Sequence, residues 1–441
     1  MHKVDAVASI VCSTLLDPDV LEKSRRRKGA FTRNNGKLPF WTMMKLLLSN
    51  IKKTISSTLD EFFTSLSKSA GIPLSNVKSC SQQAFSKARS GIDHTIFQQC
   101  FDNVLDYLCS PGSHEYVKRF GEIWKVQIIA IDGSKIPLPN RKKLLVKYGG
   151  MGRDASSPTA LASIAFDVLN ERVLEAEFEP LTVDERTLAL RHLQNIQAKN
   201  RVDLTQAMFV FDRGYASKEM ITYIEKELHS RYLFRLRDKF SKAIDSLPVP
   251  GDPTDIVDQT LELYPGIRVR VLRFYLSSGI IETLVTNDFH QDKESFRELY
   301  FLRWPVEEAY KLIKIKVGLI CFRGYSENSI LQEFWIALLL TNIANVIKLE
   351  TDGIIQQEIE LSDKDLKHNY KTNMNELAGA LSRYLPEYMD ADSPKERFAV
   401  IKHIFDFLIK HRVVDRKGSG ESNPRNVPRN VKNHYNIRYT H

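Results

Sequence analysis

The sequence predicts an α/β protein with a mixed sheet that helices cover. Three apolar runs between residues 126 and 181 have the pattern of consecutive strands, and helical and strand patterns then alternate from residue 184 to residue 239. Consecutive strands can pair as a meander, whereas strands separated by helices usually lie parallel in one sheet. We therefore expect a sheet that combines both kinds of pairing, with the helices packed on it.

The N-terminal region, residues 1–115, has a mainly helical pattern. Residues 81–108 predict two helices with a break near Gly91. Lys87 and Arg89 belong to the first of these helices. A small basic bundle of helices is a common form of DNA-reading modules, and it is also the form of many protein-binding modules.

Positive charge is concentrated near both ends of the chain. There are 63 Lys and Arg against 54 Asp and Glu, which gives a net charge of +9. Ten Lys or Arg and no acid lie from Lys23 to Lys53, and seven lie from Arg412 onward, against Asp415 and Glu421. Such clusters favour a polyanionic partner, because a phosphate backbone releases counterions when it is neutralised. A solvated surface explains a single cluster equally well.

The cysteines and the apolar runs indicate a cytoplasmic protein without a membrane partner. Five cysteines are scattered along the chain with no CxxC pair, which fits reduced thiols better than a disulfide framework or a zinc site. The N-terminus lacks the pattern of a signal peptide, and apolar runs such as Ile336–Leu340 are short for a membrane span.

Two predicted core strands are each followed by an aspartate. The apolar run Val126–Ile131 ends at Asp132, and the run Ala207–Phe211 ends at Asp212. Asp-Gly and Asp-Arg-Gly are ordinary turn sequences, so each aspartate taken alone is best interpreted as a turn residue. If the two strands are adjacent and parallel, both carboxylates lie at one edge of the sheet, where α/β proteins place their ligands.

A third acid lies on a predicted helix that begins near residue 291. At about 100° per residue, one stripe of about 60° of arc carries a phenol, two bases and an acid: Tyr300, Arg303, Glu307 and Lys314. Glu308 falls outside this stripe. Ordinary surface pairs along a helix would give a similar pattern, although a solvated face has little use for a tyrosine.

Three carboxylates without histidine or cysteine partners are hard oxygen ligands, which suit Mg²⁺ or Mn²⁺ better than zinc. Two such ions about 4 Å apart can activate a water or a 3′-hydroxyl in phosphodiester displacement. Arg303 and Lys314 would then be placed to hold phosphates.

Three motifs together resemble those of the DDE transposases of the IS4 group: IDGSK with Asp132, FDRGYAS with Asp212, and Tyr300-x2-Arg303-x3-Glu307-x6-Lys314. The last spacing matches the Tyr–Arg–Glu–Lys signature of that group at every position. The similarity extends over most of the chain.

The resemblance implies an RNase H-like mixed sheet with helices on both faces and a β-rich insertion between the second aspartate and the glutamate. It implies two Mg²⁺ or Mn²⁺ ions held by Asp132, Asp212 and Glu307. The expected DNA contacts are Tyr300, Arg303 and Lys314, with Lys87 and Arg89 as N-terminal candidates. The expected segments are a helical DNA-binding domain (1–115), the first part of the catalytic core (116–239), a β-strand insertion (240–289), the second part of the core (290–350), C-terminal helices (351–411) and a basic disordered tail (412–441).

The implied activity is cut-and-paste transposition of a bacterial insertion sequence, by way of a hairpin on the transposon end. The implied partners are double-stranded transposon ends, target DNA and a second copy of the chain in the DNA-bound complex, which would associate with the nucleoid. Two alternatives stay open: an RNase H-like DNA nuclease, and a domesticated DNA-binding protein without strand transfer.

Overall fold

The structure is a computed structural model of the 441-residue chain, and it describes residues 3–31, 38–49, 54–69, 79–110, 126–152, 154–301, 306, 309–310, 322–361 and 368–415. The chain divides into two compact units: unit 1 comprises residues 1–6, 26–92 and 346–441, and unit 2 comprises residues 7–25 and 93–345. The segment boundary expected at residue 115 does not separate these units.

The described helices are α1 (Lys3–Leu16), α2 (Pro18–Ser24), α3 (Phe40–Leu48), α4 (Ile55–Ser69), α5 (Gln82–Arg89), α6 (Thr95–Leu108), α7 (Lys142–Tyr148), α8 (Glu185–Lys199), α9 (Lys218–Lys226), α10 (Lys242–Asp245), α11 (Ser295–Phe301), α13 (Glu327–Glu360), α14 (Met374–Asp390) and α15 (Pro394–Lys410), with a 3₁₀ turn η3 (Leu204–Gln206). The described strands are β1 (Gln127–Pro137), β2 (Gly150–Met151), β3 (Ser157–Asp167), β4 (Arg172–Pro180), β5 (Ala207–Phe211), β6 (Arg231–Arg235), β7 (Ile256–Tyr264), β8 (Ile267–Tyr275), β9 (Ile281–Thr286), β10 (Tyr370–Lys371) and β11 (Val413–Val414).

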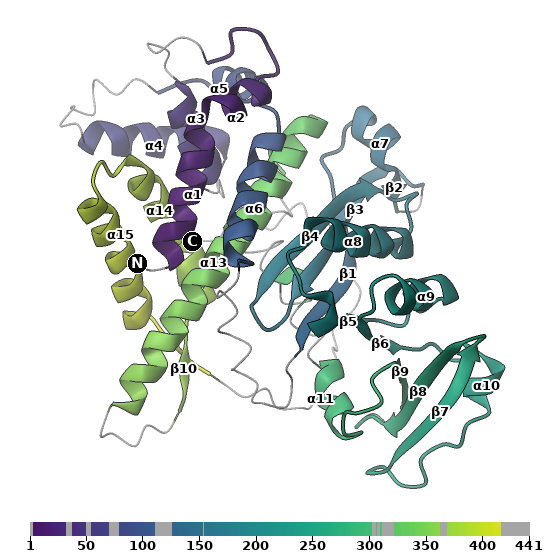
Figure 1. Ribbon diagram of the computed structural model, residues 1–441. Coiled ribbons are helices and arrows are strands. Elements are labelled where there is room, and N and C mark those ends of the chain that lie inside the picture. The colour runs from purple at the N-terminus through teal and green to yellow at the C-terminus, as the bar shows by residue number, and fades with distance from the viewer. Residues whose placement is uncertain are drawn as a thin grey trace. The chain divides into compact units, whose positions relative to one another are not determined.

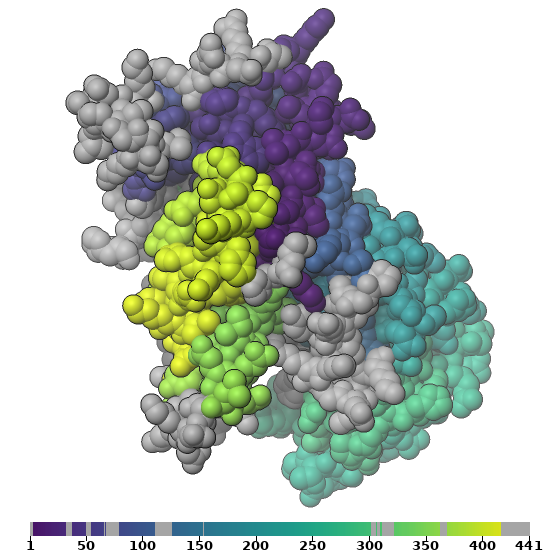
Figure 2. Space-filling model, turned by 60° about the vertical axis from the view of Figure 1, so that its left-hand side comes forward, coloured from purple at the N-terminus to yellow at the C-terminus, as the bar shows by residue number. Residues whose placement is uncertain are grey.

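Unit 1 is mainly helical. Its helix α14 packs against α15 and α3, and the outer surface of α15 is visible in yellow in Figure 2. The ammonium of Lys45 in α3 is buried and lies 2.7 Å from both carboxylate oxygens of Asp390 in α14. A buried lysine needs such a partner, because an unpaired charge is costly to remove from water. The N-terminal and C-terminal helical segments therefore share one packed unit.

Unit 2 contains the mixed sheet that the sequence predicts. Nine strands of the described chain pair in the order β2-β3-β1-β5-β6-β9-β8-β7, and β4 also pairs with β3. The strands β1, β3 and β4 form an antiparallel meander, and β5 and β6 lie parallel to β1. Figure 1 shows the sheet running from β2 and β3 to β7.

The β-rich stretch after residue 240 continues this sheet. Strands β7, β8 and β9 are antiparallel to one another, and β9 pairs antiparallel with β6. A turn that contains Ser277–Gly279 joins β8 to β9. Gly279 has a φ of +76° and donates its N–H to the Leu276 carbonyl at 2.9 Å, a conformation that glycine adopts at low cost.

Helices cover both faces of the sheet. Alternate acids of β4 bond to successive turns of α8, in the pairs Glu175–Lys199, Glu177–Asn195 and Glu179–Arg191. The intervening Phe178 packs on Phe334 of α13, with ring centroids 4.8 Å apart. Because successive strand residues point to opposite faces, α8 and the first half of α13 cover opposite sides of β4. In Figure 1, α8 lies across β4, β3 and β1, against which it packs.

By length and composition alone, helix α13 is long and apolar enough to cross a membrane. The sequence does not indicate such a helix, because the uninterrupted apolar runs of α13 are short. However, 78% of its most apolar 18-residue window is buried inside the protein. This burial is typical of a core helix of a water-soluble domain.

His192 fixes part of α8 against the sheet. It is fully buried, and its Nε2 lies 2.9 Å from the Ser163 hydroxyl of β3. Burial lowers the pKa of His192 from 6.5 to about 3. The imidazole is therefore neutral in the folded protein, and its Nδ1 has no hydrogen-bond partner.

We predict that His192 makes folding stability depend on pH. Because its pKa is lower in the folded than in the unfolded state, only the unfolded chain gains this proton between pH 6.5 and about 3. Stability should therefore fall on acidification, by about 1.4 kcal/mol per pH unit. Urea unfolding at pH 7 and at pH 5 measures how much unfolding free energy is lost between the two pH values. This loss should be about 2 kcal/mol smaller in His192→Gln than in the unchanged protein. The control is His290→Gln, at an exposed site, which should lose as much unfolding free energy as the unchanged protein. Equal losses in all three proteins would contradict the prediction.

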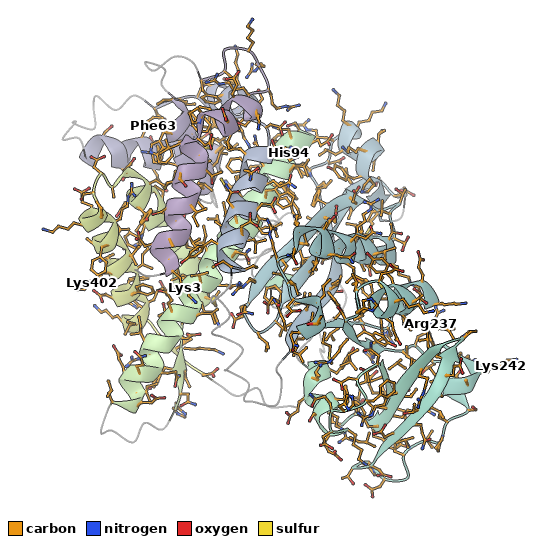
Figure 3. All side chains as sticks on the ribbon, in the orientation of Figure 1. Lys3, Phe63, His94, Arg237, Lys242 and Lys402 are labelled. Atoms are coloured by element: carbon orange, nitrogen blue, oxygen red, sulfur yellow. The ribbon has the colours of Figure 1, made fainter. Side chains whose placement is uncertain are left out.

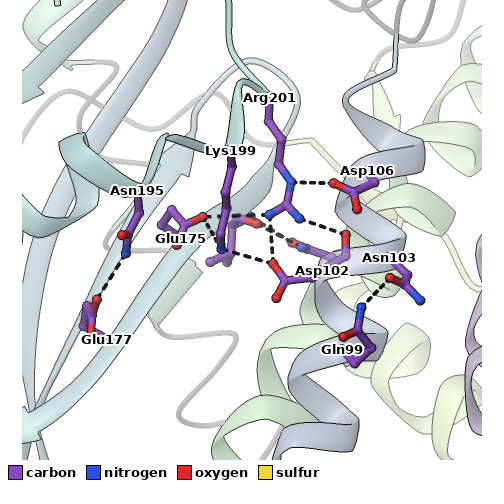
Figure 4. A network of polar contacts seen from close by, with 11 residues as sticks. Gln99, Asp102, Asn103, Asp106, Glu175, Glu177, Asn195, Lys199 and Arg201 are labelled. Atoms are coloured by element: carbon purple, nitrogen blue, oxygen red, sulfur yellow. Dashed lines mark hydrogen bonds and ion pairs between the residues drawn. The ribbon is translucent and has the colours of Figure 1, made fainter. Parts of the chain in front are cut away.

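An ionic network joins α6 to the segment around the end of α8 (Figure 4). Arg201 donates to Asp106 at 2.7 Å and to Asp102 at 2.9 Å. Lys199 lies 3.1 Å from Asp102 and 2.7 Å from the buried Glu175 of β4. Burial raises the pKa of Glu175 despite these cations, so the network depends on its bases to keep that acid charged.

We predict that Arg201→Ala destabilises the protein by about 2 kcal/mol, because Asp106 loses the base that it contacts, and Asp102 and the buried Glu175 keep only Lys199. The matched control is Arg191→Ala, which removes a more exposed ion pair with Glu179 and should cost less than about 1 kcal/mol. Thermal or urea unfolding of both variants checks the ranking, and a cost as small for Arg201 as for Arg191 would contradict it.

Candidate active site

The pairing of β1 with β5 brings Asp132 and Asp212 together. The two strands are parallel and adjacent, and Ala130 is paired with Val210. Asp132 follows Ala130 by two residues within β1, and Asp212 follows Val210 by two residues, just after the end of β5, so the register of the two strands brings both aspartates to one level. The sequence-based condition for a shared site, two adjacent parallel strands, is therefore met.

Asp132 is not a turn residue and does not end its strand. β1 continues through it to Pro137, and Asp132 pairs with Ile164 of β3. The Asp132 carbonyl accepts hydrogen bonds from the hydroxyls of Ser163 at 3.2 Å and Tyr310 at 2.8 Å. The strand extends because β3 supplies a full antiparallel partner, which the local Asp-Gly sequence does not reveal.

Asp212 stands just after the end of β5, and three described groups contact one oxygen of its carboxylate. Its Oδ1 accepts from the Arg213 N–H at 2.7 Å and from the Tyr300 hydroxyl at 3.3 Å. Nη1 of Arg235 lies 3.7 Å from the same oxygen. Oδ2 makes none of these three contacts.

Arg235 is a site residue that the sequence pattern does not indicate. It ends β6, and its Nε donates to Glu282 of β9 at 2.5 Å. Glu282 is 3% exposed, and burial raises its pKa while Arg235 opposes the change. The ion pair holds Arg235 beside Asp212, so the insertion contributes to the site through β9.

Tyr215 brings a buried hydroxyl to the same place. It follows Asp212 in the FDRGYAS motif and is 2% exposed. Its hydroxyl has no partner at full hydrogen-bond geometry, and the Glu185 carboxylate is a nearby acceptor. Burial raises the pKa of this phenol, and the carboxylates of Asp132, Glu185 and Asp212 raise it further. Tyr215 therefore lies among three acids.

Glu185 is the second residue that the sequence pattern does not indicate. It begins α8, where a first-turn acid has an ordinary structural explanation. Its side chain lies against Gly133, the residue after Asp132: a Cβ atom at Gly133 would stand 3.1 Å from the Glu185 carboxyl carbon. The sequence separation of 52 residues explains why no motif joins them.

The two aspartates are hard oxygen donors of the kind that Mg²⁺ and Mn²⁺ prefer. Within the described residues, no three Asp, Glu, His or Cys side chains converge closely enough to hold a metal ion by themselves. The carboxylate oxygens of the two aspartates fit a divalent cation, and they would supply part of its set of ligands.

The other expected site residues divide into two groups. Arg303, Glu307 and Lys314 lie outside the described residues, whereas Tyr300 is described and bonds to Asp212. In unit 1, Lys87 is exposed near the end of α5. Arg89 is only 5% exposed, and a guanidinium so buried is not available to a DNA backbone.

The aromatic side chains of the β-rich stretch differ in access. Phe274 is 2% exposed, and the Arg297 guanidinium lies 4.8 Å from its ring centre. Phe289 is 42% exposed. Of these two rings, only Phe289 is accessible from solvent.

Comparisons with known proteins agree with this geometry. The structure resembles the cryo-EM structure of a piggyBac transposase synaptic complex with hairpin DNA, at 10% sequence identity and a TM-score of 0.52; the match covers 91% of this chain and 85% of that chain. This likeness supports the RNase H-like fold. No curated protein matches the sequence. Residues 124–343, which contain both aspartates and Tyr300, match the family described as the transposase DDE domain.

Proposed function

We propose that the chain is the transposase of an insertion sequence of the IS4 group. It would cut DNA at the terminal inverted repeats of its element and join the freed ends to target DNA. The observation that carries this proposal is the level placement of Asp132 and Asp212 on adjacent parallel strands, inside a segment that matches the transposase DDE domain. The Tyr–Arg–Glu–Lys spacing supports the IS4 assignment.

Asp132, Asp212 and Glu307 would hold two Mg²⁺ or Mn²⁺ ions. When bound, such ions activate the attacking oxygen and stabilise the leaving oxygen of a phosphodiester displacement. Tyr300 and Arg235 would orient Asp212, because both act on its Oδ1 and leave Oδ2 for the ligand.

Described residues close to Glu307 in the sequence support its proposed role as the third metal ligand. Val306, Ala309 and Tyr310 are all buried. The Tyr310 hydroxyl donates to the carbonyls of Asp132 and Ala162 at 2.8 and 3.1 Å. Tyr310, three residues after Glu307, is thus tied to the strand that carries the first aspartate.

The proposed partners are the two ends of the element, the target DNA and a second copy of the chain in the DNA-bound complex. The similar piggyBac structure is a synaptic complex with hairpin DNA, and we infer a hairpin on the transposon end for this chain as well. The proposed location is the bacterial cytoplasm, at the nucleoid when DNA is bound.

We predict that Asp132→Asn, Asp212→Asn and Glu307→Gln each abolish Mg²⁺-dependent nicking of the element's end duplex, by a factor of about 10³ or more, because each removes a proposed metal ligand. Gel assays of cleavage and binding measure the effect, and binding of the uncut end should be kept.

Asp238→Asn, at an exposed position beyond β6, is the control and should cut normally. Retained cleavage by any of the three variants would refute the assignment of that residue. Joined product identifies a transposase, whereas nicks alone would indicate a nuclease.

We predict that Arg303→Ala and Lys314→Ala weaken binding of the cleaved end and lower the slope of log affinity against log salt by about 1 each, because each would remove one phosphate contact. Lys402→Ala is the control. Lys402 lies outside the matched domain and projects from α15 (Figure 3). Fluorescence anisotropy at several salt concentrations measures the slopes, and unchanged slopes for both site variants would contradict the phosphate contacts.

A further inference from the structure

We propose that Glu185 is a fourth acidic residue of the active site, which accepts hydrogen bonds from water bound to a divalent cation at Asp132 and Asp212. The ligand class is a hydrated hard cation, Mg²⁺ or Mn²⁺, which keeps several of its waters when proteins bind it. This inference rests on the proposed function and adds a residue that the three-acid motif does not contain.

The first observation is the contact between Glu185 and β1. Gly133 lies inside a regular strand, paired with Ser163, so a turn does not require this glycine. A Cβ atom at this position would stand 3.1 Å from both Cγ and Cδ of Glu185 and 3.2 Å from its Oε1. Glycine inside a strand weakens it and often marks the close approach of another group. Here the approaching group is a carboxylate, next to Asp132.

The second observation comes from Tyr215. Its buried hydroxyl lacks a partner at full hydrogen-bond geometry, although buried polar groups are almost always bonded to protein, water or an ion. The Glu185 carboxylate is near enough to attract this hydroxyl as an acceptor but does not satisfy it. The carboxylates that act on this phenol are those of Asp132, Glu185 and Asp212. A hydrated cation among these three acids brings water to the Tyr215 hydroxyl and satisfies it.

The start of α8 is held firmly enough to position Glu185. Asp184 caps the helix by accepting from the N–H groups of Arg186 and Thr187 at 3.0 and 3.1 Å. The Arg186 side chain donates to the Gly214 carbonyl at 2.8 Å, and Gly214 follows Asp212 by two residues. Glu185 is thereby fixed relative to the loop that carries the second aspartate.

The competing explanation is that Glu185 only stabilises the N-terminus of its helix. Glu219 provides a direct comparison, since it is also in the first turn of a capped helix, α9, and is exposed. A role in the helix alone does not require the carboxylate to lie against a strand glycine. It also predicts the same behaviour for both glutamates, which an experiment can test.

The experiment titrates the full-length protein with Mn²⁺ alone and follows the free Mn²⁺ signal by electron paramagnetic resonance. Glu185→Gln should weaken Mn²⁺ binding about 10-fold, the usual effect of losing a group that acts through the metal shell. Glu219→Gln should stay within about 2-fold of the unchanged protein. Thermal unfolding of Glu185→Gln should show no loss of stability, because one of several neighbouring negative charges is removed.

Asp132→Asn and Asp212→Asn separate failure of this inference from failure of the proposed function. If both weaken Mn²⁺ binding and Glu185→Gln does not, Glu185 has no role at the cation and the proposed function stands. If neither aspartate variant weakens binding, the metal site itself is refuted, and the role of Glu185 with it.

Gly133→Ala tests the geometry with every carboxylate kept. Its added methyl group should displace the Glu185 side chain and weaken Mn²⁺ binding several-fold. In the Glu185→Gln background the same change should have little further effect, because the two residues act through one contact. An equal loss in both backgrounds would show that Gly133 acts on the cation without Glu185, and would overturn the inference.

Discussion

The parallel pairing of β1 with β5 is the constraint on which the rest of the site depends. It joins residues 80 positions apart and places Asp132 and Asp212 at one level. Side-chain contacts then fix the positions of the two aspartates more closely than the backbone pairing alone. The hydroxyls of Tyr310 and Ser163 both donate to the Asp132 carbonyl, and the donors around Asp212 converge on its Oδ1. A shift of one residue in this register would turn one aspartate to the other face of the sheet.

Much of the fold could be predicted because its signals are local. Apolar runs of strand length and the break between two helices near Gly91 are each encoded within a few neighbouring residues. The meander followed by alternating helices and strands restricts the sheet to few topologies. The end of β1 was predicted wrongly, because Asp-Gly is a turn sequence in isolation and only pairing with β3 keeps it extended.

The residues around the aspartates were harder to predict, because their roles come from contacts between distant segments. Arg235 and Glu282 are ordinary strand residues until β6 pairs with β9. Glu185 looks like any first-turn glutamate until α8 packs on β1. Arg89 was a candidate DNA contact whose helix was predicted correctly, but its side chain is buried. A pattern of charges in the sequence gives the sign and spacing of the side chains and does not reveal whether they reach solvent.

The continuity of the sheet from β6 to β9 has a consequence for any attempt to shorten the chain. Residues 240–289 cannot be removed as a self-contained module, because β9 covers the backbone edge of β6. Deletion would uncover a row of unpaired N–H and C=O groups on a strand whose centre, Tyr232–Phe234, is fully buried and apolar. Such an edge recruits strands from other molecules. A minimal version of this protein would therefore aggregate unless a new element covered that edge.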